Sequence, residues 1–317
     1  MKTILVTGGA GFIGSHVCEM YLKNKYKVVC VDNLSSGLES NLSQCFKNTD
    51  FTFINADIRD ENTLNEIFLE YKLDIINHHA AQKSVGDSVD NPLYDLDING
   101  KGLLNLLMLT KQYPIEKFIY ISSGGALSKD IQGEEKSKES DTPQLVSPYA
   151  ITKFAGEKYV ELYSKLNKFE YTALRYANVY GPRQIPDGEC GVIPIFVENV
   201  LKEQPSVLMT YEDMPRGCTR DYVHILDVVD ANLYATEEPA NMTINIGSGI
   251  EYPILDIYKK IIKAFEKNVP IEVSGPRLGD IKRSVLDPSL AYRTWKWQVS
   301  ISLDEGIVSL ADYYCIK

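Results

Sequence analysis

The sequence predicts an α/β fold with a doubly wound parallel sheet and a smaller C-terminal lobe, and three observations support it. Short apolar runs alternate with segments of helical spacing from residue 2 to residue 181. A glycine-rich turn joins the first run to the first helical segment, and the regular pattern weakens after Pro182. Strands that alternate with helices form right-handed βαβ units, which build a parallel sheet with helices on both faces.

The first half of this region supplies four strands and two helices. Ile13, Val17, Met20 and Tyr21 share one face of a predicted helix, and residues 64–71 show a second helical pattern. The predicted strands are 2–7, 27–32, 51–57 and 74–81.

The second half continues the alternation. A helix is predicted over 98–109, a strand over 117–123, a helix over 149–166 and a strand over 171–181. Residues 182–191 and 212–221 are rich in Pro, Gly and charge, which is typical of a lobe built from loops and short elements. We therefore predict a cofactor-binding domain over 1–181, to which 223–250 return, and a substrate-binding lobe over 182–222 and 251–317.

Composition excludes several classes of partner. The net charge of −10 argues against nucleic acid or an anionic membrane as the main partner. No apolar run approaches the roughly 20 residues of a membrane helix, and the N-terminus lacks the features of a signal peptide. The six cysteines form no C-x-x-C pair, and the four histidines have no zinc-site spacing. These patterns predict a cytoplasmic protein with reduced thiols and no metal.

The segment TGGAGFIG at residues 7–14 is the strongest local motif. Gly8, Gly11 and Gly14 lie between a predicted strand and a predicted helix, as in dinucleotide-binding turns. Glycines allow the backbone to approach a pyrophosphate, and the helix N-terminus offers free N–H groups and the positive end of its dipole. The motif therefore predicts a dinucleotide site and, with it, a Rossmann-type sheet.

Two acidic residues end the next two strands. Asp32 follows Gly14 by 18 residues, and a carboxylate there accepts hydrogen bonds from an adenosine ribose and repels a 2′-phosphate. This favours NAD over NADP. Asp57 ends the third strand, where it could meet the adenine or could equally be a turn carboxylate before Arg59.

Tyr149 and Lys153 lie four residues apart on a predicted helix and so share a face. A nearby ammonium and the cationic nicotinamide ring favour the phenolate form of a tyrosine, which makes it a usable base. Alone, the pair could be an exposed i,i+4 contact. Its place after a dinucleotide motif and a serine-rich strand end indicates catalysis.

The ordered motifs TGGAGFIG, HHAAQKSV, SSGGA, YAITK, RYANVYGPRQ, RDYVHILD, NIGSG and PRLGD resemble those of the extended short-chain dehydrogenases/reductases. The resemblance is strongest to the nucleotide-sugar 4-epimerase branch, of the UDP-glucose/galactose 4-epimerase type, and it covers nearly the whole chain. It implies that Tyr149 takes the proton of the sugar 4-hydroxyl while C4 passes a hydride to NAD. The 4-keto sugar would then turn over, and the hydride would return to its other face.

The resemblance also assigns individual positions. Lys153 would bind the nicotinamide ribose, Lys83 matches a cofactor-contacting position, and Asn99 matches a residue that positions the active-site helix. Asn178 matches a contact to the substrate diphosphate, and Arg220 and Arg277 match a cationic grip on it. The candidate catalytic residues are Tyr149, Lys153, Ser123 and Ser122. The candidate cofactor-binding residues are Gly8, Gly11, Phe12, Ile13, Gly14, Asp32, Asn33, Asp57, Ile58, Ala80, Ala81, Lys83, Asn99, Tyr149 and Lys153. The candidate substrate-binding residues are Lys83, Ser123, Tyr149, Asn178, Arg220, Arg277, Asp280 and Ser284.

The segment SSGGAL bears on the type of reaction. Related dehydratases and decarboxylases carry an acidic residue in this motif, and its absence here favours epimerisation. The segment also departs from the family, because Gly124 replaces a Ser or Thr, and Ser128-Lys129 replace the usual Tyr-Gly. Ser122 and Ser123 remain to orient the 4-hydroxyl, and we prefer Ser123. Alternation along the strand points the two serines in opposite directions, and both could instead bond the backbone.

The sugar stays open between UDP-glucose/galactose, UDP-GlcNAc/GalNAc and a UDP-uronic acid. Ser284 matches a position where a Tyr often restricts the pocket, so a small residue leaves room for an N-acetyl group. Lys282 and Arg283 could meet a uronic carboxylate.

Other activities and the oligomeric state also stay open at this point. Alternatives are a nucleotide-sugar reductase, a 3,5-epimerase and a cofactor-sensing module without catalysis. The resemblance further implies a homodimer through helices holding 99–109 and 149–166, although their apolar side chains could equally pack on the sheet.

Overall fold

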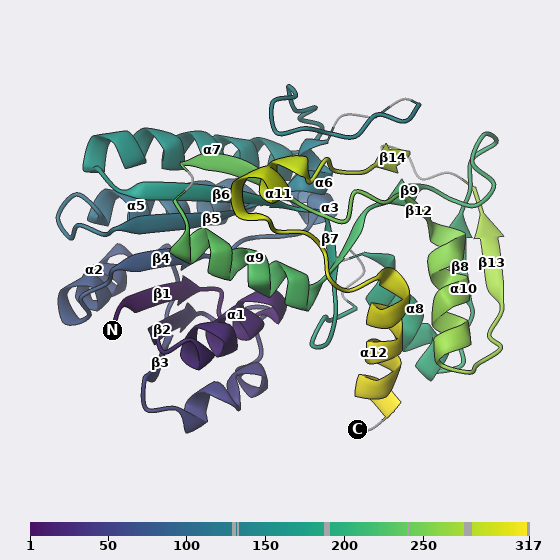
Figure 1. Ribbon diagram of the computed structural model, residues 1–317, viewed down its shortest axis with the longest axis horizontal. Coiled ribbons are helices and arrows are strands. Elements are labelled where there is room, and N and C mark those ends of the chain that lie inside the picture. The colour runs from purple at the N-terminus through teal and green to yellow at the C-terminus, as the bar shows by residue number, and fades with distance from the viewer. Residues whose placement is uncertain (129–130, 132, 187–190, 240, 276–280, 316–317) are drawn as a thin grey trace. The chain divides into compact units, whose positions relative to one another are not determined.

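The structure is a computed structural model that describes residues 1–128, 131, 133–186, 191–239, 241–275 and 281–315 (Figure 1). The chain divides into two compact units. The first contains residues 1–126, 145–175 and 229–244, and the second contains 127–144, 176–228 and 245–317. The predicted cofactor-binding domain also included 127–144, 176–181, 223–228 and 245–250, and these residues belong to the second unit.

The first unit is built on a seven-stranded sheet with the order β11-β6-β5-β4-β1-β2-β3. Its strands are β1 (Thr3–Thr7), β2 (Lys27–Asp32), β3 (Phe51–Asn55), β4 (Ile75–His78), β5 (Lys117–Ser123), β6 (Glu170–Tyr176) and β11 (Met242–Ile246). The pairs β1–β2, β2–β3, β1–β4 and β4–β5 are parallel. The predicted α/β fold with a doubly wound, Rossmann-type sheet is confirmed.

The strand order reverses at β1, which has β2 on one side and β4 on the other. Ligands of open α/β sheets bind at the carboxyl ends of the strands beside such a switch point. The glycine-rich turn follows β1 at this point, and Ala80 and Ala81 follow β4.

Helices cover both faces of the sheet in the first unit. On one face, a core that includes Leu64, Leu106, Phe118 and Val160 joins the sheet to α2, α5 and α7. On the other face, buried Asn77 of β4 donates to Tyr21 of α1 and to Asn232 of α9. The helical segments of this unit are α1 (Phe12–Lys23), η1 (Glu39–Leu42), η2 (Cys45–Lys47), α2 (Glu61–Glu70), α3 (Val85–Asp90), α4 (Pro92–Leu96), the π-helical η3 (Asp97–Gly102), α5 (Leu103–Leu109), α7 (Pro148–Asn167) and most of α9 (Ile225–Glu237).

The strand predicted over 171–181 is interrupted. β6 ends at Tyr176, the Ala177 N–H donates to the Ile246 carbonyl, and β7 (Asn178–Tyr180) pairs with β10 (Tyr222–His224) instead. The prediction of one continuous strand was therefore wrong, because β7 finds its partner far along the chain.

The second unit contains more helix than the predicted lobe of loops and short elements. A separate core that includes Phe196, Ile257, Tyr258 and Ile307 joins α8, α10 and α12. Its helices are α8 (Val192–Leu201), α10 (Ile254–Ala264), α11 (Ser289–Trp295) and α12 (Leu303–Cys315). The short α6 (Gly124–Leu127) lies mostly in the first unit. Its other strands are β8 (Ser206–Met209), β9 (Thr219–Arg220), β12 (Tyr252–Pro253), β13 (Ile271–Ser274) and β14 (Arg283–Ser284).

Candidate active site

The turn after β1 is shaped by the absence of side chains. Gly8 has φ +68°, and a Cβ atom there would lie 2.6 Å from the Ala80 nitrogen. A Cβ on Gly14 would lie 2.2 Å from the Gly8 carbonyl oxygen. Helix α1 can therefore start directly against the turn, which only glycine at these positions permits.

The start of α1 fits a pyrophosphate. Gly11 is the N-cap and makes no side-chain hydrogen bond to the helix, and the first turn, with Phe12, Ile13 and Gly14, carries no acidic residue. The first amides of a helix have no partner within the helix and attract anions together with the helix dipole. The cradle leaves room for a pyrophosphate, and the role of Gly8, Gly11 and Gly14 in holding a dinucleotide stays a prediction.

Asp32 at the end of β2 is buried and bound to the same turn. One carboxylate oxygen accepts from the Ala10 N–H at 3.0 Å, and the other accepts from the Leu34 N–H at 2.8 Å. Burial raises the pKa of the Asp32 carboxyl, and the hydrogen bonds from these backbone amides oppose that rise. A carboxylate held in this way can still accept hydrogen bonds from ribose hydroxyls.

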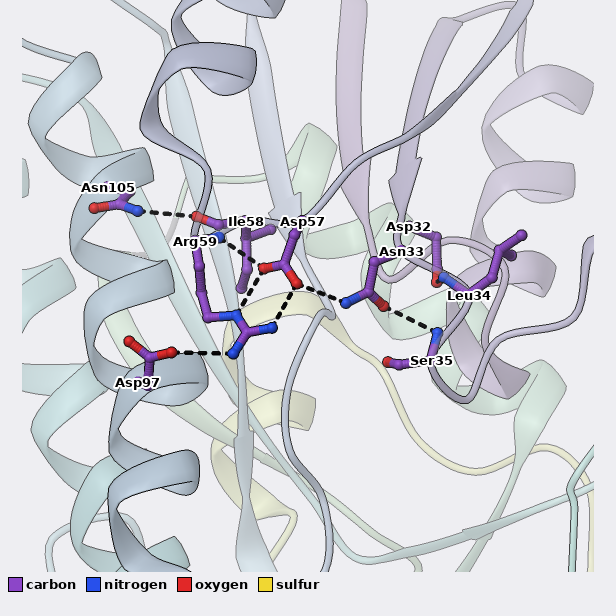
Figure 2. A network of polar contacts seen from close by, with 9 residues as sticks. All are labelled: Asp32, Asn33, Leu34, Ser35, Asp57, Ile58, Arg59, Asp97 and Asn105. Carbon is purple, nitrogen blue, oxygen red and sulfur yellow. Dashed lines mark hydrogen bonds and ion pairs between the residues drawn. The ribbon is translucent and has the colours of Figure 1, made fainter.

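Asp57 lies in a different network, which Figure 2 shows. Its carboxylate accepts from the Arg59 guanidinium at 2.8 and 2.9 Å, from the Arg59 N–H at 2.8 Å and from Asn33 Nδ2 at 2.8 Å. These bonds, the Arg59 side chain above all, hold the pKa of Asp57 well below its usual value. The structure therefore shows Asp57 as a turn carboxylate, paired with the arginine two residues later.

The surroundings of Asp57 extend this network towards the helices. Arg59 also pairs with Asp97 of η3 at 3.0 Å, and Asn105 of α5 donates to the carbonyl of buried Ile58 at 3.1 Å. Asn33 and Ile58, both predicted cofactor contacts, are thus fixed by polar bonds beside Asp57.

Asn99 fixes the segment that follows β4. Its Oδ1 accepts from the Gln82 N–H at 2.9 Å, and its Nδ2 donates to the Gln82 carbonyl at 3.0 Å. The same Nδ2 donates to Asp95 at 2.9 Å and to Thr152 of α7 at 3.5 Å. Asn99 therefore connects the segment with Ala80, Ala81 and exposed Lys83 to α7, and its role in positioning the active-site helix stays a prediction.

Helix α7 presents Tyr149 and Lys153 from its first turns. Ser147 caps the helix through the Ala150 N–H, and Pro148 occupies its first position, where its missing N–H costs nothing. The Lys153 Nζ lies 5.9 Å from the centre of the Tyr149 ring and 5.2 Å from that of Tyr120. It donates to the Ile121 carbonyl at 2.8 Å.

The charge of Lys153 depends on its buried surroundings. Burial lowers the pKa of Lys153 to about 8, and the carboxylates of Asp95 and Glu157 oppose that shift. An ammonium beside a tyrosine favours its phenolate form, and the catalytic relation of Lys153 to Tyr149 stays a prediction.

The two serines at the end of β5 have different partners. The Ser122 hydroxyl is buried and donates to Glu157 Oε1 at 2.6 Å. Ser123 is half-buried, and its Oγ accepts from the Ala126 N–H at 3.2 Å. Because Oγ acts as an acceptor in this bond, the hydroxyl of Ser123 can still donate to a ligand.

Three buried charged residues near this site were missed by the sequence analysis. Glu157 and Arg175 form a bidentate pair at 2.8 Å, and Asp95 accepts from Thr152 at 2.6 Å. Glu157 lies four residues after Lys153 on the same helix, a spacing that could have suggested it. Nothing local to Arg175 or Asp95 indicated that they would be buried.

The candidate substrate residues of the second unit lie around β7, β9 and β14. The Asn178 amide donates to the Asp221 carbonyl at 3.0 Å, and Arg220 donates to the Thr219 carbonyl at 2.8 Å. Ser284 is buried, and its hydroxyl bonds that of Ser128 at 3.4 Å. Arg277 and Asp280 lie outside the described residues.

Asp221, which the sequence analysis did not single out, joins these segments. It is buried and accepts from the Ser248 N–H and hydroxyl, the Gly249 N–H and the Leu286 N–H. Its own N–H donates to the Ser284 carbonyl, which fixes the register of β9 and β14.

Comparison with known families shows the family to which the chain belongs. Residues 4–247 match the model of the NAD dependent epimerase/dehydratase family. The chain belongs to this family. Its glycine cradle, Asp32 and the Tyr149–Lys153 pair lie within the matched region.

Individual relatives agree with this membership. The chain is 36% identical over 315 residues to the UDP-glucose 4-epimerase of Mycolicibacterium smegmatis, with 99% of this chain and 98% of the relative covered. The UDP-glucose 4-epimerase of Thermotoga maritima, solved with UDP-glucose, is 38% identical with a TM-score of 0.92 over 99% of both chains. The UDP-glucose 4-epimerase of Thermus thermophilus, solved with NAD, is 36% identical with a TM-score of 0.91 over 99% of both chains.

Two features are absent from the residues that the structure describes. None of their helices is long and apolar enough to cross a membrane. None of their His, Cys, Asp and Glu side chains gather in threes as a metal site requires.

Proposed function

We propose that the chain catalyses the reversible C4 epimerisation of a nucleotide sugar, a UDP-hexose, with NAD as its cofactor. The observation that carries this proposal is the position of Tyr149 and buried Lys153 on α7, against the end of β5. That strand end offers serine hydroxyls and no carboxylate, so it supplies nothing to drive elimination from the sugar.

Each residue has a chemical task in this reaction. When bound, NAD supplies a hydride acceptor that can also give the hydride back. Gly8, Gly11 and Gly14 would admit its pyrophosphate to the start of α1, and Asp32 would bind its adenosine ribose. Tyr149 would hold and return the proton of the 4-hydroxyl, and Lys153 would favour the phenolate.

The polar groups of the second unit support a neutral sugar over a uronic acid. Arg283 forms a bidentate pair with Glu251, at 2.6 and 2.5 Å, and Lys282 pairs with Asp213 at 2.8 Å. Both cations are therefore already neutralised by carboxylates. Ser284 and Ser128 are small and buried, which leaves the choice between a hexose and its N-acetylated form to experiment.

The proposal is tested by incubating the purified protein with UDP-galactose, UDP-GalNAc and UDP-galacturonate without added cofactor and following each by NMR. We expect conversion of at least one of the two neutral sugars to its C4 epimer. Conversion of none of the three would refute the proposed function, and conversion of only the uronate would refute the assignment to a neutral hexose.

We also propose that the chain forms a homodimer through α4–α5 and α7. Exposed apolar residues recur at helical spacing on both segments, among them Leu93, Leu96 and Met108 on the first and Leu162 and Leu166 on α7. Exposed apolar side chains that gather into one surface mark interaction sites, and the proposed dimer would bury these residues. Light scattering should give twice the chain mass of 35.7 kDa, and Leu96→Glu with Leu162→Glu should give the single mass. A single mass for the unchanged chain would contradict the dimer.

The cytoplasm stays the predicted location of the protein.

A further inference from the structure

Glu157 is a buried carboxylate that the proposed chemistry does not use. It lies on α7 one turn after Lys153, and only 2% of its surface is exposed. Its Oε1 accepts from the Ser122 hydroxyl at 2.6 Å and from Arg175 Nε at 2.8 Å, and its Oε2 accepts from the second Arg175 nitrogen at 2.8 Å. A buried charge is costly unless it is paired in this manner.

These bonds join three elements at one point. Glu157 belongs to α7, Ser122 to the end of β5 and Arg175 to β6. One residue before Ser122, the Ile121 carbonyl accepts from Lys153 Nζ at 2.8 Å. Two side chains of α7 therefore hold two successive residues of β5, and the next residue is Ser123.

The hydrogen bond from Ser122 to Glu157 determines which of the two serines, Ser122 or Ser123, can still donate a hydrogen bond to a ligand. A hydroxyl has one proton to donate, and Ser122 gives its proton to Glu157. Successive side chains of a strand point to opposite faces, so Ser122 in this position turns Ser123 the other way.

Glu157 is also one of the groups that set the electrostatics around Lys153. Titratable groups from several elements interact with its ammonium or lie against it: Asp95 of α4, His78 and His79 at the end of β4, Tyr120 of β5, and Tyr149 and Glu157 of α7. Burial lowers the pKa of both histidines, that of His79 to about 3, so they are neutral at neutral pH. Asp95 and Glu157 are then the anions that interact with Lys153, and Arg175 of β6, paired with Glu157, is the second buried cation of this cluster.

We propose that Glu157 is a positioning residue of the active site, which fixes the end of β5 through Ser122, leaves Ser123 to hold the reacting hydroxyl and balances the ammonium of Lys153. The part that concerns the reacting hydroxyl rests on the proposed epimerase function. The part that concerns Lys153 does not depend on the substrate.

The test compares Glu157→Gln with the unchanged protein in two measurements. The first is kcat and KM per NAD-loaded protein on the converted sugar, where we expect kcat to fall about 10- to 100-fold with KM within about twofold. The second is the titration of Lys153, followed by NMR of isotope-labelled lysine side chains with Lys153→Met to assign the signal. Loss of the carboxylate should move that titration to lower pH.

Three further variants separate the roles. Glu157→Asp keeps the charge but shortens the reach, so the titration should stay near that of the unchanged protein while kcat remains several-fold low. Lys117→Met removes a buried cation at the start of β5, where Nζ bonds the carbonyls of Thr236 and Glu238. It should lower stability and leave kcat and the Lys153 titration unchanged. If Glu157→Gln does not fold, Glu157→Gln with Arg175→Met removes both buried charges. Its kcat should still fall, but its Lys153 titration should move less than in Glu157→Gln, because loss of the Arg175 cation opposes loss of the carboxylate.

A purely structural Glu157 would behave differently. Glu157→Gln would then match Lys117→Met, with lower stability but unchanged kcat per NAD-loaded protein and an unchanged Lys153 titration, and that result overturns the proposal. If the unchanged protein converts no sugar, the epimerase function fails by itself, and the Lys153 titration alone decides for or against Glu157.

Discussion

The glycine turn after β1 and the α7–β5 face build their parts of the active site by opposite means. The turn works through missing atoms: Gly8 and Gly14 leave room where a Cβ would lie 2.6 or 2.2 Å from backbone atoms. The α7–β5 face works through buried charge, with Lys153, Glu157 and Arg175 each less than 7% exposed. One region is thus defined by shape and backbone dipoles, and the other by paired charges in a dry environment.

The difference predicts which changes each region tolerates. Backbone amides do not titrate, so the turn should hold its cofactor over a wide pH range but fail on addition of a single methyl group. The α7–β5 face has functional groups whose charge depends on pH and on each other. It should respond to pH and to isosteric changes that leave its shape intact.

The largest expected effect is on the α7–β5 face. Tyr149→Phe removes only the phenolic oxygen, and loss of a general acid–base group costs about 10²- to 10⁴-fold in kcat. The NAD content and the melting temperature should not change, because the glycine turn is intact. Activity assays and measurement of bound NAD after denaturation check this, and full activity of the variant would remove Tyr149 from the mechanism.

The next effect tests the glycine turn. In Gly14→Ala the new methyl group meets the Gly8 carbonyl, and overpacking of this kind costs about 1–3 kcal/mol, or roughly 5- to 150-fold in NAD affinity. Gly100→Ala is the matched control, since its methyl group would meet only the exposed, flexible Leu96 side chain. The NAD retained per protein after dialysis, measured after denaturation, compares the two, and equal NAD contents would contradict the steric account.

A smaller effect is the different pH dependence that we expect for the α7–β5 face and the glycine turn. Burial lowers the pKa of Lys153 to about 8, so the ammonium is present below that pH and is lost above it. We expect kcat to decline as pH rises through about 8, while the retained NAD stays within about twofold, because the turn has no group that titrates there. A kcat that is constant to pH values well above 8 would show that Lys153 does not need its charge.

The smallest effect concerns the network of Asp57. Its pKa is lowered in the fold, so its stabilisation is present above the usual carboxyl value of about 4 and is lost as pH falls below it. The pair with Arg59 is partly exposed to solvent, so Asp57→Asn should cost only about 0.5–1 kcal/mol at neutral pH. Urea unfolding at neutral and acidic pH should show this difference shrinking in acid, and a constant difference would exclude the ion pair as its cause.

Sequence reasoning succeeded where the determining contacts are local. The strands predicted over 27–32 and 117–123 coincide with β2 and β5, because a short apolar run before a polar turn sets both ends. The glycine turn, its following helix and the Tyr149–Lys153 pair were recognisable for the same reason. The alternative that Asp57 is a turn carboxylate beside Arg59 could also be stated from the sequence, because Arg59 is only two residues away.

It failed where a residue's partner lies far along the chain. The interruption after Tyr176 depends on β10, with Asn178 paired to Tyr222. The Ser122 hydroxyl donates to Glu157, which lies 35 residues further along the chain. Glu157 in turn accepts from Arg175, which lies 18 residues after it. No spacing rule within one element could reveal them, because packing of three elements creates them.

The most direct test of the central claim is to run the C4 epimerisation in deuterated water and follow the sugar by NMR. If Tyr149 moves only the hydroxyl proton and the hydrogen on C4 leaves and returns through the tightly held cofactor, the epimer should form with ordinary hydrogen at C4. Deuterium at C4 would show exchange with solvent and would contradict this mechanism, and so would failure to form any epimer.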